Sequence, residues 1–182
     1  MLLRGDPPKG EEVFTPPRNG FNYASELIQY VEENYDYCKA AAAYVEKHPE
    51  APSLEEDIKH LKTKVSAGAD FLITQLFFIN QYYFDFVERV RAAGINCRII
   101  PGIIPLTSYH QIARFTQMSS AEIPEALSSE IEANRDNKEK MYEIGLEYTI
   151  DQCRELLAKG APGLHFYTLN KSRAAVEIFE SL

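Results

Sequence analysis

Three segments of this chain repeat the same order of structural signals. In each, a helical pattern ends near a glycine, a short turn follows, and an apolar run begins: residues 67–73 (AGADFLI), 92–100 (AAGINCRII) and 158–167 (AKGAPGLHFY). Such a repeat is typical of alternating strands and crossover helices. It therefore predicts a parallel sheet whose neighbouring strands are joined by right-handed crossovers.

The apolar runs have the composition of strands that are covered on both faces. Residues 71–79 (FLITQLFFI) and 97–106 (CRIIPGIIPL) are nearly continuous in Leu, Ile and Phe, as buried parallel strands are. The alanine-rich run 38–45 and the run 163–169 are the other two expected strands. Residues 1–3 would be the end of a fifth strand, because Arg-Gly-Asp-Pro-Pro follows and two prolines stop a strand.

Amphipathic patterns between these runs predict the helices. The helix that begins after Ser53 has a capping box, with Glu56 three residues later, and Gly68 at its end. The expected helices are residues 23–35, 53–67, 81–93, 108–118, 137–159 and 170–182, and residues 134–137 form a polar break between two helices.

Two architectures accommodate such a chain, an open doubly wound sheet and a (βα)8 barrel. No glycine-rich GxGxxG or GxxxxGK[ST] segment follows an expected strand, which weakens a dinucleotide or P-loop reading. Polar residues that meet from several strand ends are typical of a barrel. They are Asp6, Glu46, Gln75, Thr168 and Asn170. We expect an α/β fold of the (βα)8 TIM-barrel type, with about the last four to five βα units in one domain over residues 1–182.

Composition and residue spacing argue against several classes of function. The net charge of −8, from 27 acidic and 19 basic residues, disfavours a nucleic-acid partner. The longest apolar run is interrupted by Thr74 and Gln75 and is too short to span a membrane. Neither the three cysteines nor the four histidines have metal-ligand spacing. With no secretory signal at residues 1–20, we expect a cytoplasmic protein with reduced thiols and no bound metal.

Two polar residues are candidates for ligand contact because of where they fall. Asp6 directly follows the end of an expected strand, and its alternative role is that of a turn residue before two prolines. Gln75 lies inside the most apolar run, where an amide needs hydrogen-bond partners. Its partner is either the backbone or the edge of a heterocycle such as a pterin or purine, which an amide can match with a donor and an acceptor.

Other patterns leave two readings open. Asp57, His60 and Lys64 form a polar stripe on one helix, which is either a solvated ion-pair face or a cradle for a phosphate-bearing cofactor. Spacing alone favours the solvated face. Gln111 is by default a surface residue and Phe115 a core residue. No Ser/His/Asp or Cys/His set has persuasive spacing, so nucleophilic hydrolysis has no support.

Taken together, the motifs resemble the methylenetetrahydrofolate reductase family of flavin-dependent barrel enzymes. The combination of LRGD, ITQLFF, PGIIP and HFYTLN is specific, although each alone would be weak. The matching stretches are LRGDPP at 3–8, NYASEL at 22–27, AYVEKHPEA at 43–51, DIKHLKTKVSAGADFLITQLFF at 57–78, IIPGIIPLTSYHQIARF at 99–115 and GLHFYTLNKS at 163–172.

The resemblance implies an activity, a cofactor and a set of site residues. The activity is FAD-dependent reduction of 5,10-methylenetetrahydrofolate to 5-methyltetrahydrofolate with NAD(P)H, as part of one-carbon and methionine metabolism. Asp6 would be the catalytic residue, facing flavin and pterin. The residues implied to bind flavin are Tyr23, Ala24, Ala42, Tyr44, His48, Asp57, His60 and Lys64. Those implied to bind folate or nicotinamide are Gln75, Gln111, Phe115 and Lys171.

The chain also departs from the family pattern. Lys171 stands where relatives often carry arginine, which keeps the charge but loses the planar fork. Val45 follows Tyr44 where the family usually has proline. We further expect the family's first three strands and most of the fourth to be missing, and with them the glutamate that acts as general acid.

Three functional hypotheses follow from the resemblance. The first is the reductase activity itself, with a homo-oligomer expected for the full-length form. The second is a catalytically incompetent barrel fragment that acts only as a partner subunit. The third is another flavin-barrel oxidoreductase, against which the position of Gln75 argues.

Overall fold

The sheet consists of parallel strands that pair in the order of the chain. The structure, a computed structural model, describes residues 1–8, 10, 11, 13–109, 111, 112 and 121–182. In this part of the chain the strands are β1 (Ala40–Ala43), β2 (Phe71–Leu76), β3 (Arg98–Ile103) and β4 (His165–Phe166), in the order β1-β2-β3-β4. All four fall inside the apolar runs that the sequence indicated, although each is shorter than its run.

The N-terminal segment adds to this sheet at its β1 edge. Leu2 forms a parallel bridge with Ala41, and its backbone N–H donates to the carbonyl of Ala40 at 2.8 Å. Ala41 also pairs with Leu72 of β2, so Leu2 lies on the opposite side of β1. This confirms the expected strand end. A doubly wound sheet reverses its strand order at a switch point, whereas an order without reversal belongs to a (βα)8-type barrel, here as a partial one.

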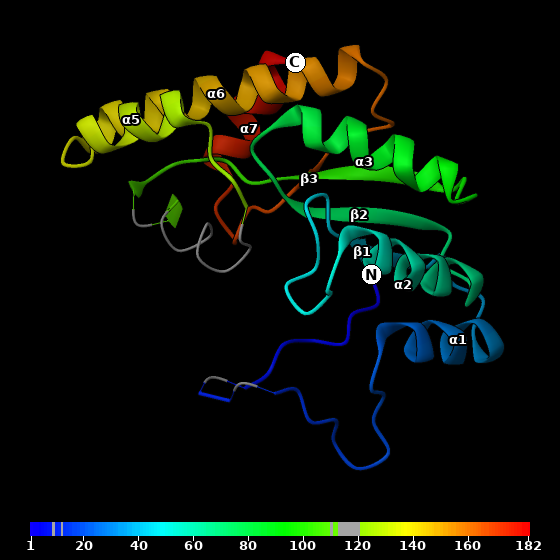
Figure 1. Ribbon diagram of the computed structural model, residues 1–182. Coiled ribbons are helices and arrows are strands. Elements are labelled where there is room, and N and C mark those ends of the chain that lie inside the picture. The colour runs from blue at the N-terminus through cyan, green and yellow to red at the C-terminus, as the bar shows by residue number, and fades with distance from the viewer. Residues whose placement is uncertain (9, 12, 110, 113–120) are drawn as a thin grey trace.

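The helices alternate with the strands as the sequence predicted. Figure 1 shows α1, α2, α3 and α6 following one another along the sheet. For five of the helices the bounds agree with the expected ones to within three residues, whereas the sequence analysis gave no bounds for the helix Glu125–Ala133. The expected helix at 108–118 lies mostly outside the described residues. The helices are α1 (Ala24–Asn34), α2 (Leu54–Ser66), α3 (Asn80–Ala92), α5 (Glu125–Ala133), α6 (Lys138–Ala158) and α7 (Arg173–Ser181).

Local hydrogen bonds explain where α2 begins and ends. The Ser53 hydroxyl accepts from the backbone N–H of Glu56 at 3.3 Å, which satisfies a donor that the first turn of a helix leaves free. At the other end Gly68 has a φ of +113°, a conformation that glycine adopts without the strain of a Cβ. The chain therefore leaves α2 in a tight turn and enters β2 after two further residues.

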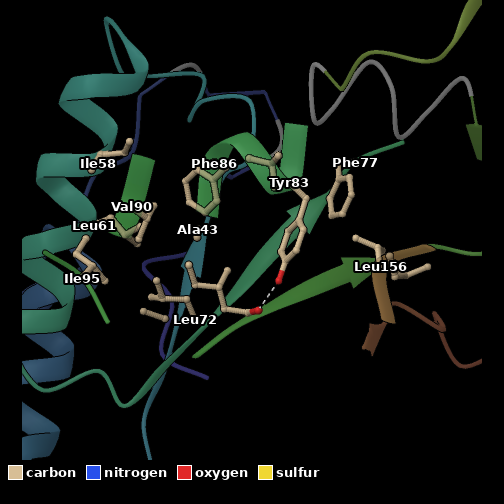
Figure 2. Packing of buried hydrophobic residues seen from close by; sticks show 14 of the residues in the cluster. Ala43, Ile58, Leu61, Leu72, Phe77, Tyr83, Phe86, Val90, Ile95 and Leu156 are labelled. Carbon is tan, nitrogen blue, oxygen red and sulfur yellow. Dashed lines mark hydrogen bonds between the residues drawn. The ribbon is translucent and has the colours of Figure 1, made fainter. Parts of the chain in front are cut away.

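The main core lies between the sheet and its helices. Leu72 of β2 is fully buried there, with Phe86 and Val90 of α3 and Leu156 of α6 (Figure 2). In the same cluster the Tyr83 hydroxyl donates to the carbonyl of Ile99 at 2.8 Å. Burial raises the pKa of Tyr83 to about 12, so this hydroxyl stays protonated and able to donate.

A second apolar cluster lies at the carboxyl ends of β2 and β3, under α5 and α6. It contains Leu76, Phe78, Ile104 and Leu106 from the strand ends and Leu127, Ile131, Met141 and Ile144 from the two helices. From α6, the side chain of Gln152 donates to the carbonyl of Phe77 at 2.9 Å, and the Tyr148 hydroxyl donates to the carbonyl of Phe78. These bonds replace sheet pairing, and β2 ends at Leu76 although the apolar run continues to Ile79.

We predict that Gly145→Ala destabilises the protein. A Cβ at this buried position of α6 would overlap the carbonyl oxygen of Leu106, and backbone cannot move aside as a flexible side chain can. In an open helix the same change would stabilise by about 1 kcal/mol. Overpacking reverses the sign, with an expected loss of about 1–3 kcal/mol in the free energy of unfolding.

The measurement is the midpoint of urea unfolding, with Glu147→Ala as the control on an exposed position of the same helix. The control should change the free energy of unfolding by less than about 0.5 kcal/mol. An unchanged or raised midpoint for Gly145→Ala would show that α6 does not press against Leu106.

Candidate functional site

Polar side chains gather where the strands end. Asp6 follows the segment that pairs with β1, Tyr44 directly follows β1, and Gln75 lies near the end of β2. Because these segments are all parallel, their carboxyl ends open at the same edge of the sheet. We call this edge, with the loops that leave it, the rim. In barrels of this kind the rim is where ligands bind.

Tyr44, at the end of β1, interacts with polar residues at the other two strand ends. Its half-buried hydroxyl has a raised pKa, first because of burial and then because of the negative charge of Asp6, whereas a hydrogen bond with Gln75 lowers it. Asp6 and Gln75 therefore both interact with the Tyr44 hydroxyl. The ring of Tyr44 also meets that of His48 edge to face, with 4.6 Å between centroids. The result is a polar and aromatic surface that faces the rim.

The loop after β1 fixes the orientation of His48. Its backbone N–H donates to a carboxylate oxygen of Asp57 at 2.8 Å, and the backbone N–H of Glu50 donates to its Nδ1 at 3.1 Å. An Nδ1 that accepts a hydrogen bond leaves the proton of the neutral ring on Nε2. Burial lowers the pKa of His48, which favours this neutral form. His48 therefore presents an Nε2–H donor.

Lys64 of α2 places a positive charge beside β1. Its ammonium group donates to the carbonyl of Ala42 at 3.0 Å. Burial lowers the pKa of Lys64, the carboxylate of Asp57 raises it, and the positive charge of Arg4 lowers it. Beside it β1 consists of four alanines, so no long side chain of that strand occupies the space. An ammonium group is a donor that can form a charge-assisted hydrogen bond with a phosphate.

An ion pair that sequence reasoning missed anchors the N-terminal segment to the rim. The guanidinium of Arg4 binds both carboxylate oxygens of Glu50, at 2.6 and 2.9 Å, and lies 4.8 Å from the ring centroid of Phe14. Hydrogen bonding with Arg4 lowers the pKa of Glu50. The two residues are 46 positions apart, and no local pattern links them. The pair ties the segment that carries Asp6 to the loop that carries His48.

The structure thus brings together seven of the residues that the sequence singled out. They are Asp6, Ala42, Tyr44, His48, Asp57, Lys64 and Gln75, which are joined by the contacts and electrostatic interactions given above. Their ligand roles stay predictions. Arg4 and Glu50 are additional members of the rim.

The contacts given above do not include the remaining candidates. Tyr23 and Ala24 are at the start of α1, and the Tyr23 side chain is exposed. His60 is exposed on α2, so only Asp57 and Lys64 of the predicted stripe belong to the rim. The Gln111 amide accepts a hydrogen bond from the Thr107 hydroxyl at 2.6 Å, and Lys171 is exposed. Phe115 lies outside the described residues.

Within the described ranges, no three or more His, Cys, Asp or Glu side chains are arranged to hold a metal ion. Across the described residues, no helix combines the length and the apolar character needed to cross a membrane.

We predict that the pKa of His48 lies below 6.5 and falls further in the variant Glu50→Gln. Burial is the main cause of the low value, and the carboxylate of Glu50 is the largest effect that opposes it. The pKa is measured from the pH dependence of the imidazole Cε1–H chemical shift. His165, whose pKa is also lowered by burial but without a contribution from Glu50, serves as the internal reference. A His48 pKa that is unchanged or raised in Glu50→Gln would contradict the geometry of this loop.

Comparisons with known proteins assign the chain to a family. The family model for methylenetetrahydrofolate reductase matches residues 1–182. "Methylenetetrahydrofolate reductase 1" of Schizosaccharomyces pombe is 39% identical, with 100% of this chain and 30% of the relative covered. "5,10-methylenetetrahydrofolate reductase" of Escherichia coli is 37% identical over 182 residues, with 100% of this chain and 60% of the relative covered. The chain thus spans only part of the length of these relatives.

A solved structure has the same fold. It is an uncharacterized protein from Clostridium thermocellum that binds two copies of 5-methyl-5,6,7,8-tetrahydrofolic acid. The TM-score is 0.59 at 17% sequence identity, with 96% of this chain and 64% of that chain covered. At this identity the similarity concerns the fold alone. By the family match and the sequence identities, the chain belongs to the methylenetetrahydrofolate reductase family.

Proposed function

We propose that this chain takes part in the FAD-dependent reduction of 5,10-methylenetetrahydrofolate to 5-methyltetrahydrofolate with NAD(P)H. The observation that carries the proposal is the meeting of Asp6, Tyr44 and Gln75, from three strand ends, at one rim. Family membership supports the reaction class. The names of relatives give the nicotinamide as NADH in Arabidopsis thaliana and NADPH in Caenorhabditis elegans.

The residues present fit a flavin cofactor by their donor chemistry. The Lys64 ammonium would hold phosphate, Asp57 would accept from ribityl hydroxyls, and the Nε2–H of His48 and the ring of Tyr44 would meet the rest of the cofactor. Bound FAD supplies hydride transfer between the nicotinamide and folate. Tyr23, Ala24 and His60 remain part of the proposal through the family resemblance alone.

Gln75 and Asp6 are the residues proposed to face the pterin. The Gln75 amide offers a donor and an acceptor side by side, as one edge of a pterin does. Its Oε1 accepts from the backbone N–H of Leu76 at 3.0 Å, which limits how the amide can turn. Asp6 is exposed at the rim and would place a carboxylate near both rings. Gln111, Phe115 and Lys171 are proposed to contact the outer parts of folate or the nicotinamide.

A second candidate function is that of a subunit that completes its site with another polypeptide. Among the described residues, β4 pairs only with β3, through two residues, so one edge of the sheet is open. The helix α7 that follows leaves Val176 48% and Phe179 74% exposed. Open edges and apolar helix faces favour association.

We predict that Lys64→Met weakens FAD binding by about tenfold or more, because the variant keeps the apolar stem and removes the charge. Binding is measured by quenching of flavin fluorescence on titration with the purified chain. Lys59→Met, on an exposed position of the same helix, is the matched control and should bind FAD as the unmodified chain does.

Equal affinities for the two variants would remove Lys64 from the cofactor site. If the unmodified chain binds no FAD until a second family polypeptide is added, the subunit function replaces the complete reductase as the conclusion.

We also predict that Gln75→Leu weakens binding of 5-methyltetrahydrofolate by about tenfold or more and leaves FAD affinity nearly unchanged. A buried polar edge of the ligand would lose its partner, at a cost of about 1–3 kcal/mol. Isothermal titration calorimetry measures both ligands. Equal losses for folate and flavin would indicate general damage to the rim and would count against a pterin role for Gln75.

A further inference from the structure

The strand that carries Gln75 contains an irregularity next to it. Ile73 pairs with Ile100 and Leu76 pairs with Gly102, so β2 advances three residues while β3 advances two. The extra residue is a β-bulge at Thr74 and Gln75. A bulge changes which face of a sheet the following side chains occupy, because side chains alternate with a period of two.

Side chains replace the sheet hydrogen bonds that are interrupted at this bulge. The backbone N–H of Gly102 donates to the Thr74 hydroxyl at 2.8 Å instead of to a strand carbonyl. The carbonyl of Thr74 accepts from the hydroxyl of Tyr167 at 2.9 Å. Thr74 has no exposed surface, so without the Tyr167 hydroxyl its carbonyl could not form a hydrogen bond with water instead.

Tyr167 can reach Thr74 only because β3 has a glycine in between. Tyr167 directly follows β4, and its ring passes β3 at Gly102 to reach β2. A Cβ at Gly102 would lie 2.8 Å from the Tyr167 ring and would overlap the carbonyl of Thr74. The bulge in β2, Gly102 in β3 and Tyr167 directly after β4 therefore contact one another.

The same tyrosine lies beside the proposed pterin site. Its hydroxyl donates to the carbonyl of Thr74, the residue next to Gln75. Burial first, and then the electrostatic interaction with Tyr44, raises the pKa of Tyr167 to about 12. Tyr44 in turn hydrogen-bonds Gln75. The high pKa also means that the Tyr167 hydroxyl stays a donor at every pH at which the protein would be studied.

We propose that Tyr167 is a positioning residue that sets the orientation of the Gln75 amide by holding the carbonyl of Thr74. The inference rests on the proposed role of Gln75 in binding the pterin. Tyr167 acts through the residue that precedes Gln75 and needs no contact of its own with the ligand. Its loss should therefore lower folate affinity without lowering flavin affinity.

The test is a double-mutant cycle on the full chain, with 5-methyltetrahydrofolate as the titrated ligand. Tyr167→Phe keeps the ring and removes the hydroxyl, and should weaken folate binding by about five- to tenfold. In the Gln75→Leu background the same change should have less than about a twofold effect, because residues that act as a unit are not additive.

Tyr83→Phe is the matched control. It also removes a tyrosine hydroxyl from a backbone carbonyl, that of Ile99, but on the face of the sheet that packs against α3. It should lower the unfolding midpoint and leave folate affinity unchanged. A second pair of variants, Thr74→Val and Thr74→Ser, removes or keeps the hydroxyl that Gly102 needs, and only Thr74→Val should weaken folate binding.

The outcomes separate the positioning role from the function on which it rests. Equal fold-losses from Tyr167→Phe with and without Gln75→Leu would overturn the positioning role and leave the folate site in place. Unchanged folate affinity in Gln75→Leu itself would overturn the proposed function. A loss in Tyr83→Phe as large as that in Tyr167→Phe would show that stability, and not the bulge, sets folate affinity.

Discussion

Neighbouring strands in this sheet are parallel and follow one another in the chain, so each connection has to return from the carboxyl end of one strand to the amino end of the next. The loops that leave the strands therefore all open at one rim, and the helices return along one side of the sheet (Figure 1). This constraint brings Asp6, Tyr44 and Gln75 together although they are far apart in sequence. No single contact could do so, because each of these residues sits on a separate strand or its extension.

The rim is also where regular sheet hydrogen bonding ends, and side chains of the proposed site take over that task. Asp57 accepts from the backbone of His48, Lys64 donates to the carbonyl of Ala42, and Tyr167 donates to that of Thr74. Each such bond contributes about 1 kcal/mol net, but a buried backbone group left without a partner costs about 1–3 kcal/mol. Stability and ligand binding at the rim therefore depend on the same side chains. This is why the control variants have to remove equivalent bonds elsewhere.

Local chemistry was readable from the sequence, and long-range geometry was not. Ser53 and Gly68 marked the ends of α2 because a cap is decided within a few residues. Gln75 stood out because an amide inside an apolar run needs a partner. The bulge beside it could not be predicted, since it depends on a tyrosine 93 residues away and on a missing side chain at Gly102. The end of β2 at Leu76 likewise depends on α6.

Helical spacing alone did not predict which charged residues of α2 are exposed and which face the sheet. Asp57, His60 and Lys64 share a stripe by helical period, yet His60 is exposed while Lys64 reaches the backbone of β1. The rotation of α2 against the sheet decides which of the three residues face the rim, and the sequence pattern does not contain that rotation. The solvated ion-pair face that spacing favoured therefore describes His60 and not Lys64.

The buried charge at the rim lowers the stability of the folded protein, and an anionic ligand would offset this loss. Burial lowers the pKa of Lys64 below its ordinary value, so the unfolded chain binds its proton more tightly, and the charged lysine lowers stability at neutral pH. The lowered pKa of His48 also lowers stability as pH falls through 6.5. The lowered pKa of Glu50 has the opposite sign, because it adds stability above pH 4.5 that is lost as pH falls below 4.5. A phosphate beside Lys64 would favour its charged form and reverse the first of these effects. The net charge of −8 disfavours an extended polyanion, but it does not prevent this local site from taking a small one.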